Sequence, residues 1–361
     1  MAIGGLGVAL LGWSYVSALR EPDSPGWQLR TAEWVRDMHL GFVLDVVEWC
    51  VDSQKSEKAE TEEPTELSVF PPPFELRREK LESPREPSPI PISFKVPLPH
   101  EGEWKSIGWT INGTPTLRCT TFRPDAAHPN RVVAVARFTP ELTRFVLVPG
   151  TKDPGGKWSW HGEIPKSKRS TLLAAFNAGF RLRDAKGGLY AEERVARRLV
   201  EGAASFVVDR NGAPDIIAWP ADSAAPNDWL AVRQNLRLIV QNGVVEPTLE
   251  QNPGGAWGRL NHTLFIWRSG LGIARDGALL YVAGNGLTLM ALAQAMRQAG
   301  AVRAMELDIH HAWPSFNVFQ PKAANRRRHL LATKLMPSMR RPAERYLSPD
   351  DRDFVAAFVR D

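Results

Sequence analysis

From about residue 104 to its end, the chain alternates short apolar runs with polar or glycine-containing breaks, a pattern typical of β-strands. The runs are short and rich in β-branched or aromatic residues. Asn211-Gly212, Asn242-Gly243 and Asp276-Gly277 follow three of them and predict tight hairpins. The predicted strands are Val132–Ala136, Arg144–Val148, Thr171–Phe176, Ala204–Val208, Leu236–Val240, Thr263–Trp267, Leu271–Ala274 and Ala278–Ala283.

One segment has helical spacing instead. Leu289, Leu292 and Met296 recur on one face between the apolar run 278–283 and a second run that ends at Asp308. The glycine turn 284–288 and Gly300 separate these elements, and a right-handed crossover places the helix on one face of the sheet. The sequence therefore predicts an α+β or mixed α/β fold: a large twisted mixed sheet, flanking helices and at least one βαβ unit.

The amino-terminal part is organised differently. Residues 1–19 contain no charged side chain, and as a helix they would span about 27 Å, close to the roughly 30 Å core of a bilayer. We interpret them as a signal anchor or transmembrane helix, which places the rest of the chain outside the cytoplasm at the cell membrane. Cleavage of that helix would make the protein secreted.

Three further segments complete the predicted organisation. Residues 20–53 form a short helical segment, because Trp34, Met38, Phe42, Val46 and Trp49 recur at helical spacing. Residues 54–103 are first acidic and then rich in proline, which predicts a linker. Residues 104–361 form the main domain.

Composition narrows the class of protein. Hydrophobic residues make up 43% of the 361 residues, as in a globular protein with a sizeable core. A net charge of +5 favours anionic partners but is no nucleic-acid signature, so no nucleic-acid partner is predicted. Cys50 and Cys119 do not have the spacing of a metal site, and the sequence leaves open whether they form a disulfide.

Polar residues at predicted strand ends indicate a ligand site. Asn177, Arg268 and Asp308 each lie at or just past the end of an apolar run, and glycine follows closely after the first two. Open sheets that contain parallel strands bind ligands beyond the carboxyl ends of those strands, and glycine lets a ligand approach the backbone. These three positions therefore mark one edge of the sheet as the candidate site.

The same positions carry a family resemblance. Four segments resemble, in order and spacing, the motifs N-G-G-F-F, R-T-A-x-G, G-x-T and N-L-D-G-G-G-S of the phosphodiester glycosidases, a family that includes the lysosomal uncovering enzyme. Residues 29–36 and 339–353 further resemble a bacterial, membrane-anchored branch of that family. The four segments are Asn177-Ala178-Gly179-Phe180, Arg268-Ser269-Gly270-Leu271-Gly272, Gly286-Leu287-Thr288 and Leu307-Asp308.

The resemblance implies a hydrolase that separates a sugar's anomeric carbon from a phosphodiester, here in a cell-envelope glycan or glycopolymer, and it implies no cofactor. One departure is marked: the run from Ile309 to Phe316 replaces the family's glycine-rich loop after the aspartate. If that loop makes room for the substrate, its loss favours the alternative of a non-catalytic glycan-binding module. The matched positions predict a substrate-binding set of Asn177, Gly179, Phe180, Ser269, Gly286, Thr288, His310 and Trp313.

The chemistry suggests roles for three residues. A phosphate ester is a good leaving group, so a guanidinium that holds it can replace a strong general acid, and Arg268 is the candidate. Asp308 is the carboxylate that stabilises or attacks the anomeric carbon, or activates water. Glu306 lies two residues earlier on the same face, about 6.6 Å away between Cα atoms, and is the candidate second carboxylate. A surface ion pair between Glu306 and a base such as Arg303 is the alternative.

A metal-dependent phosphodiesterase is a further alternative. His310 and His311 follow Asp308 closely, and His161 or His262 lies elsewhere in the chain. Carboxylate and imidazole ligands with an open position suit a catalytic metal. Adjacent residues on a strand point to opposite faces, however, so at most one of the two neighbouring histidines reaches the same ion as Asp308. The preferred prediction therefore contains no metal.

Overall fold

A computed structural model describes residues 12–17, 19, 31, 34–35, 66–77, 86–220, 229–258, 265–322 and 330–360. The chain divides into two compact units, residues 1–58 and 59–361. In the first unit residues 12–17 are helical, and the hydroxyl groups of Tyr15 and Thr31 lie 2.8 Å apart. None of the helices among the described residues has the length and apolar character needed to cross a bilayer. Most of the predicted anchor, most of the segment 20–53, and Cys50 lie outside the described residues.

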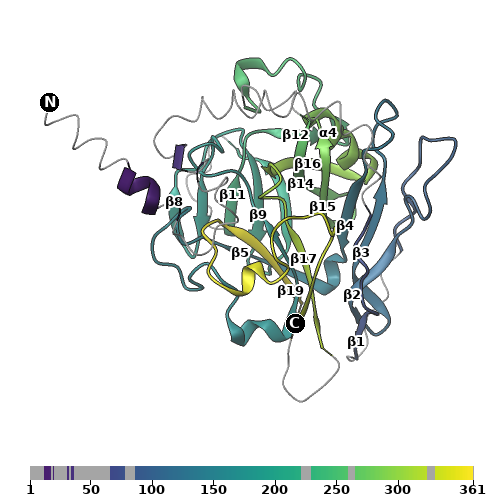
Figure 1. Cartoon of the computed structure of the whole chain (residues 1–361), viewed down its shortest axis with the longest axis horizontal. Coiled ribbons are helices and arrows are strands. Elements are labelled where there is room, and N and C mark those ends of the chain that lie inside the picture. Colours follow the sequence, from purple (N-terminus) through teal and green to yellow (C-terminus); the bar gives the residue numbers. More distant parts are fainter. Residues whose placement is uncertain are drawn as a thin grey trace, which may run out of the picture. The chain divides into compact units, whose positions relative to one another are not determined.

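The second unit is built from three sheets (Figure 1). The largest has nine strands, and all of its pairings are antiparallel except the one between β1 and β2. In spatial order its strands are β1 (Phe74–Leu76), β2 (Lys105–Ile111), β3 (Thr114–Phe122), β4 (Val133–Phe138), β15 (Leu279–Leu287), β14 (Ile266–Ala274), β16 (Ala301–Ile309), β12 (Leu238–Gln241) and β13 (Val244–Val245).

The two smaller sheets have five strands each, and short 3₁₀ helices connect several strands. The first contains, in spatial order, β10 (Pro214–Ala218), β9 (Ala204–Asp209), β11 (Trp229–Gln234), β7 (Leu189–Ala191) and β8 (Arg194–Arg197). The second contains β18 (Leu330–Lys334), β17 (Phe316–Pro321), β6 (Leu172–Asn177), β19 (Phe354–Val359) and β5 (Thr143–Val148). The 3₁₀ helices are η2 (Pro140–Leu142), η3 (Lys166–Thr171), η4 (Pro253–Gly255) and η5 (Arg345–Leu347).

Alternation along the strands explains how the sheets pack. In β4, Ala134 and Ala136 belong to the core cluster shared with the two smaller sheets, whereas Val133 and Val135 belong to the cluster under the helix α4 (Leu289–Gln298). Successive side chains of a strand point to opposite faces, so a nearly continuous apolar run is what a sheet buried on both faces requires. The nine-stranded sheet is therefore the central layer, with α4 on one face and the smaller sheets on the other.

The predicted βαβ unit is confirmed, with one strand inserted. The helix α4 connects β15 to β16, and β14 pairs antiparallel with both, so β15 and β16 run parallel on either side of it. Figure 1 shows α4 beside these strands. Gly272 lets α4 approach β14, because a Cβ there would lie 2.6 Å from the Met296 side chain of the helix. A Cβ at Gly270 would make only ordinary contact with Leu292, at 3.5 Å, but would lie 3.0 Å from the Met305 carbonyl of β16.

Several local predictions are confirmed and others need correction. The three predicted hairpin turns connect β9 to β10, β12 to β13 and β14 to β15. The sheet-rich mixed fold is confirmed, but it consists of three sheets, and α4 is the one α-helix in the described part of the second unit. The glycines at 284 and 286 do not follow a strand; they lie inside β15, with Gly286 at a φ of +66°.

Candidate functional site

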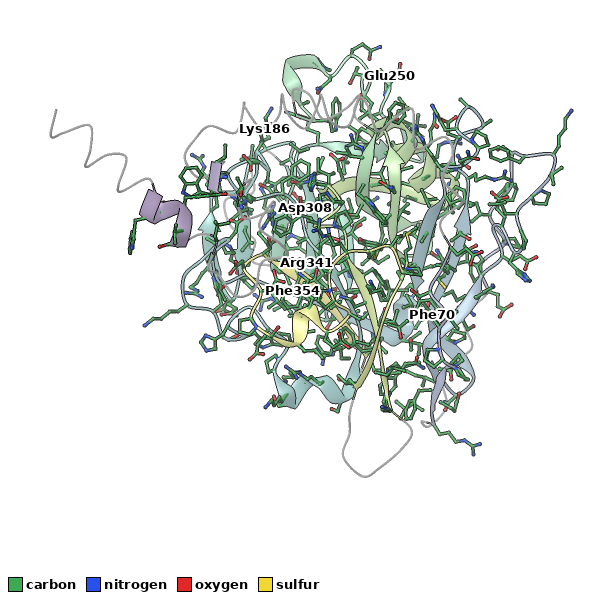
Figure 2. The ribbon with its side chains drawn as sticks, in the orientation of Figure 1. Phe70, Lys186, Glu250, Asp308, Arg341 and Phe354 are labelled. Carbon is green, nitrogen blue, oxygen red and sulfur yellow. The ribbon has the colours of Figure 1, made fainter. Side chains whose placement is uncertain are left out.

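The candidate site lies where three strands bring the predicted positions together. Asn177 is the last residue of β6, and Asp308 is the second-last residue of β16. The backbone N–H of Asp308 donates to the carbonyl of Ala178 over 3.1 Å, which joins the end of one sheet to the end of another. Arg268, in contrast, lies inside β14 rather than after a strand. Figure 2 labels Asp308 in this part of the molecule.

Asn177 and Ser269 form the framework of the site. The Asn177 amide nitrogen donates to Ser269 Oγ over 3.0 Å, and its Oδ1 accepts from the Tyr281 hydroxyl and the Ser315 N–H, each over 2.9 Å. Ser269 Oγ in turn donates to the backbone carbonyl of Asp308 over 2.7 Å. All of these residues are buried. Both polar side chains are thus engaged in positioning the backbone around Asp308.

Arg268 and Glu306 form a closed ion pair on the α4 face of the sheet. Arg268 Nη1 lies 2.6 Å from Glu306 Oε1, and its Nε donates to the Leu287 carbonyl over 2.7 Å. The side chains of both residues are 0% exposed. Burial lowers the pKa of Arg268 despite the opposing effect of Glu306. The partner of Glu306 is therefore Arg268, whereas Arg303 pairs with Asp215.

Asp308 is paired with a different arginine. Arg352 Nη2 donates to Asp308 Oδ2 over 2.8 Å and to the Gly179 carbonyl over 3.1 Å, while Asp308 Oδ1 accepts from the Ile309 N–H over 3.0 Å. Burial raises the pKa of Asp308, an effect that Arg352 and the Ile309 hydrogen bond reduce but do not cancel. The Asp308 side chain remains 10% exposed, so it still reaches solvent.

Cationic side chains surround Trp313, which the sequence predicted for the site. The Arg352 guanidinium carbon lies 4.8 Å from the Trp313 ring centre, and those of Arg341 and Arg345 lie 5.2 and 5.8 Å away. Asp350 neutralises Arg345 through two hydrogen bonds. Arginines stacked on an indole keep their planar faces fixed and direct their donors to the side. This arrangement suits a bound anion such as a phosphate.

The loop that replaces the glycines of the family motif is held by contacts within itself and with neighbouring segments. His310 adopts a φ of +75°, and its backbone N–H donates to the Trp267 carbonyl over 2.8 Å. The rings of His310 and His311 lie 4.1 Å apart, and Arg340 contacts His311 Nε2. A non-glycine residue in the left-handed region is uncommon, and the turn closes with the Trp313 N–H on the His310 carbonyl. The loop therefore fills the space after Asp308 with aromatic rings.

The remaining predicted positions separate into two groups. Gly179 and Phe180 lie beside Asp308: Gly179 O binds Arg352, and the Phe180 N–H donates to Asn235 Oδ1 over 3.2 Å. A Cβ at Gly179 would lie 3.0 Å from the Asn235 side chain, which explains the glycine. Gly286 and Thr288 lie instead at the start of α4, where Thr288 Oγ1 accepts from the Ala291 N–H over 3.1 Å as a helix cap.

Sequence reasoning missed the arginine that contacts Asp308. Arg352 lies just before the last apolar run, β19, so its position at a strand end was the available signal. The next residue, Asp353, forms a buried ion pair with Arg233, and Arg233 also binds the Phe180 carbonyl. Burial raises the pKa of Asp353 in spite of that pair. These contacts fix the loop after β6 against the segment that carries Arg352.

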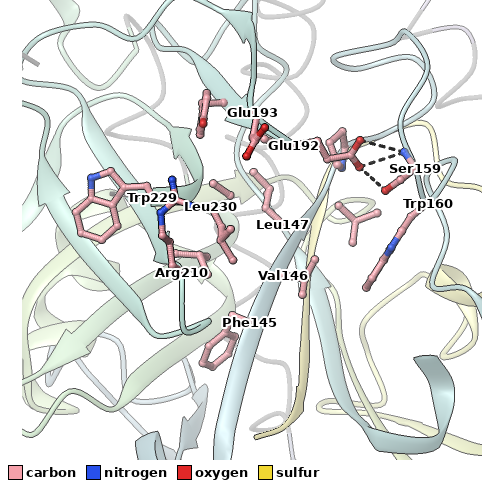
Figure 3. A pocket seen from close by; sticks show the side chains of 16 residues that line it. Phe145, Val146, Leu147, Ser159, Trp160, Glu192, Glu193, Arg210, Trp229 and Leu230 are labelled. Atoms are coloured by element: carbon pink, nitrogen blue, oxygen red, sulfur yellow. Dashed lines mark hydrogen bonds between the residues drawn. The ribbon is translucent and has the colours of Figure 1, made fainter. Parts of the chain in front are cut away.

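Two other features lie apart from Asp308 and Arg352. Among the described residues, no group of three or more His, Cys, Asp or Glu side chains is placed to hold a metal ion; His262 lies outside those residues. A separate pocket of about 240 Å³ lies along β5, and Glu192 at its rim accepts hydrogen bonds from Ser159 (Figure 3). Its lining is mostly apolar and includes neither Asp308 nor Arg352.

Comparisons with known proteins locate the resemblance. Residues 170–308 match the model of the phosphodiester glycosidase family, which confirms the resemblance over that stretch. The match includes Asn177, Arg268 and Asp308 and ends before Arg352. No curated protein matches the chain.

Three solved structures are similar to the chain. The catalytic domain of zebrafish N-acetylglucosamine-1-phosphodiester alpha-N-acetylglucosaminidase, auto-inhibited by its pro-peptide, is 13% identical, with 68% of this chain and 84% of that chain covered and a TM-score of 0.45. A hypothetical protein from Synechocystis is 14% identical, with 70% and 64% covered and a TM-score of 0.39. A putative exported protein from Burkholderia pseudomallei is 12% identical, with 64% and 74% covered and a TM-score of 0.34.

Proposed function

We propose that this protein is a hydrolase that cleaves the bond between a sugar's anomeric carbon and a phosphodiester. The observation that carries the proposal is the Arg352–Asp308 pair, 2.8 Å apart with side chains that are 8% and 10% exposed, because Asp308 is the last residue of the stretch that matches the phosphodiester glycosidase family. The pair supplies the two groups that this reaction needs, a cation for the leaving phosphate and a carboxylate for the anomeric carbon.

Arg352 is the guanidinium that we assign to the phosphate, in place of Arg268. The Arg268 side chain is fully buried and bonded to Glu306 and to a backbone carbonyl, whereas the Arg352 side chain is 8% exposed. Arg341, which lies over the same indole ring, adds positive charge beside it. A phosphate held by these groups leaves as a stabilised anion and needs no strong general acid.

Asp308 is the carboxylate that faces the anomeric carbon. Its Oδ1 accepts a backbone hydrogen bond and its Oδ2 binds Arg352, so the orientation of the group is fixed before a substrate arrives. A fixed negative charge stabilises the oxocarbenium-like carbon as the bond to phosphate breaks.

The substrate class and location form part of the same proposal. We assign the substrate to phosphodiester-linked sugars of a cell-envelope glycan or glycopolymer, because the cationic side chains around Trp313 suit a phosphate in its diester form. The apolar segment 1–19 supports attachment to the cell membrane with the second unit outside the cytoplasm.

A non-catalytic glycan-binding module is the second candidate. One observation favours it: Arg352 Nη2 donates to both Asp308 and the Gly179 carbonyl, so a phosphate has to compete with these two acceptors. If a substrate does not displace these contacts, the site binds a phosphate-linked sugar without turning it over. Turnover and binding must therefore be measured on the same compound.

The test uses the full chain and N-acetylglucosamine linked through its 1-phosphate to mannose. Release of free N-acetylglucosamine is measured for the wild type, for Asp308→Asn and for the matched control Asp351→Asn, each with and without chelator. Asp351 lies beside Arg352 in sequence but bonds to Thr151 and Lys152 instead. We expect turnover by the wild type and the control, loss in Asp308→Asn, and no effect of chelator. Binding without turnover would support the second candidate, and inhibition by chelator would support a metal-dependent reaction.

A further inference from the structure

A second carboxylate shares Arg352 with Asp308. Asp153 Oδ2 lies 3.7 Å from Arg352 Nε, while Asp308 Oδ2 lies 2.8 Å from Arg352 Nη2. Both contacts are made to one planar guanidinium, which keeps the two carboxylate oxygens within about 9 Å of each other. Paired carboxylates in glycoside hydrolysis are separated by about 5 to 9.5 Å, and the upper bound that Arg352 sets is compatible with that range.

Exposure distinguishes Asp153 from the other acidic residues nearby. The side chains of Glu306 and Asp353 are 0% exposed, and each is held by its own arginine. The Asp350 side chain is 5% exposed and bonds to Arg345 through both oxygens. The Asp153 side chain is 19% exposed, compared with 10% for Asp308. Of these carboxylates, only Asp153 and Asp308 are both near Arg352 and open to a substrate or a water molecule.

The backbone holds Asp153 in place. A parallel β-bridge pairs Asp153 with Arg352, and the Asp153 N–H donates to the Asp351 carbonyl over 2.9 Å. Asp153 Oδ2 also accepts from the Leu182 N–H over 2.9 Å, which ties it to the loop that begins at Asn177. Three segments that lie far apart in sequence therefore converge on this carboxylate. Its other oxygen, Oδ1, takes part in none of these contacts.

We infer that Asp153 is the second carboxylate of the reaction and the base that takes a proton from the attacking water. This inference rests on the proposed function and replaces Glu306 in that role. Glu306 has no exposed surface from which to reach a water molecule, and its charge is committed to Arg268. In this assignment Asp153 activates water, and Asp308 stabilises the anomeric carbon.

The step balances without any further reactant. The water oxygen forms a bond to the anomeric carbon, and the bond from that carbon to the bridging phosphate oxygen breaks, with its electron pair leaving on the phosphate. The proton from water passes to the Asp153 carboxylate and afterwards to the released phosphate monoester. Arg352 holds the phosphate and stays charged throughout.

The test measures sugar release by the full chain from the same N-acetylglucosamine phosphodiester, with and without sodium azide. Asp153→Asn keeps an acceptor for the Leu182 N–H but cannot act as a base, and Asp351→Asn is the matched control. We expect Asp153→Asn to lose about 10² to 10⁴ in kcat, the usual contribution of a general base. Azide has no proton to lose, so we expect it to restore turnover at least about tenfold and to give a glycosyl azide. The control should keep its activity.

Several outcomes would overturn the inference. If Asp153→Asn stays within about threefold of the wild type, the residue is not the base. If it loses activity, keeps the melting temperature of the wild type and forms no glycosyl azide, Asp153 only positions Arg352. If Asp153→Asn does not fold, Asp153→Ser is judged by the same azide product. An inactive wild type would overturn the proposed function as well as the role of Asp153. If the wild type is active and Asp308→Asn is inactive, the proposed function stands, and the Asp153 variants then test the role of Asp153 alone.

Discussion

Two arginine–carboxylate pairs at the same end of the nine-stranded sheet differ in what they can reach. Arg268 and Glu306 are 0% exposed and lie under the start of α4, whereas the side chains of Arg352 and Asp308 are 8% and 10% exposed. The first pair lies within strands β14 and β16, and the second joins β16 to the segment before β19. The buried Arg268–Glu306 pair can therefore contribute to stability, whereas the Arg352–Asp308 pair can also take part in a reaction. Residue type and spacing do not distinguish the two pairs, but burial does.

The largest expected effect is on stability, at the buried pair. Glu306→Ala removes the carboxylate that binds the buried Arg268 guanidinium, so we expect the free energy of unfolding to fall by about 3–5 kcal/mol. Replacing both residues with apolar ones, Arg268→Met with Glu306→Leu, should recover most of that loss, because such replacements are often neutral. Urea unfolding measures the free energy of unfolding of both the single and the double variant. Equal stability of Glu306→Ala and the wild type would show that the pair contributes nothing.

At the Arg352–Asp308 pair, we expect substitution to affect turnover more than stability. Arg352→Gln removes the cation assigned to the leaving phosphate, so we expect kcat/KM on the sugar phosphodiester to fall about 10²- to 10³-fold. Its effect on stability should be smaller than that of Glu306→Ala, because Asp308 can take up a proton when its partner is lost. Initial rates and urea unfolding on the same samples test the contrast. If Arg352→Gln lost stability but kept normal turnover, Arg352 would have a structural role and would not bind the leaving phosphate.

The pKa of Asp308 gives a further test of this pair. Because burial raises that pKa, the wild-type rate should rise with pH through a value above the ordinary one of about 3.9. The sign for stability follows from the same shift. The folded state holds the proton more tightly, so the stabilisation is complete below the unfolded-state pKa and is lost as pH rises through the folded-state pKa. Melting temperatures of the wild type and Asp308→Asn, measured across pH, should therefore differ more above that pKa than below it.

The smallest effect is expected at a residue that the motif match assigned to the substrate. Thr288 caps α4 through its side-chain oxygen. Thr288→Ala should cost about 1 kcal/mol of stability, while Thr288→Ser should restore the cap. We expect neither variant to change KM. A rise in KM for Thr288→Ala that Thr288→Ser corrects would place the hydroxyl on the substrate instead.

The sequence predicted most of the local structure in the second unit. Short apolar runs rich in β-branched residues identified strands, the Asn-Gly and Asp-Gly pairs identified hairpins, and Leu289, Leu292 and Met296 identified the buried face of α4. The strand breaks expected at Arg268 and at Gly284 were wrong, because β14 and β15 continue through them. A polar residue can continue a strand when a neighbouring strand supplies a partner for its side chain, as Glu306 does for Arg268. Local patterns do not contain that information.

The site was predicted less completely than the fold. Strand-end reasoning identified Asn177 and Asp308, which the structure places on neighbouring segments. Arg352 lies 44 residues after Asp308, in the segment 339–353, whose resemblance to one branch of the family assigned no role to it. Asp153 lies far before Asp308, in a loop with no motif of its own. Their proximity depends on how β5, β6 and β19 pair in one sheet. Long-range pairing of this kind is set by the whole core and not by any single segment.

Arg352, and not Arg268, is the guanidinium that we assign to the phosphate. The most direct test is the rate of N-acetylglucosamine release from the phosphodiester by Arg352→Gln and by the double variant Arg268→Met with Glu306→Leu. We predict near-complete loss of N-acetylglucosamine release in Arg352→Gln and nearly normal release in the double variant. Normal turnover in Arg352→Gln together with an inactive but fully folded double variant would contradict this assignment.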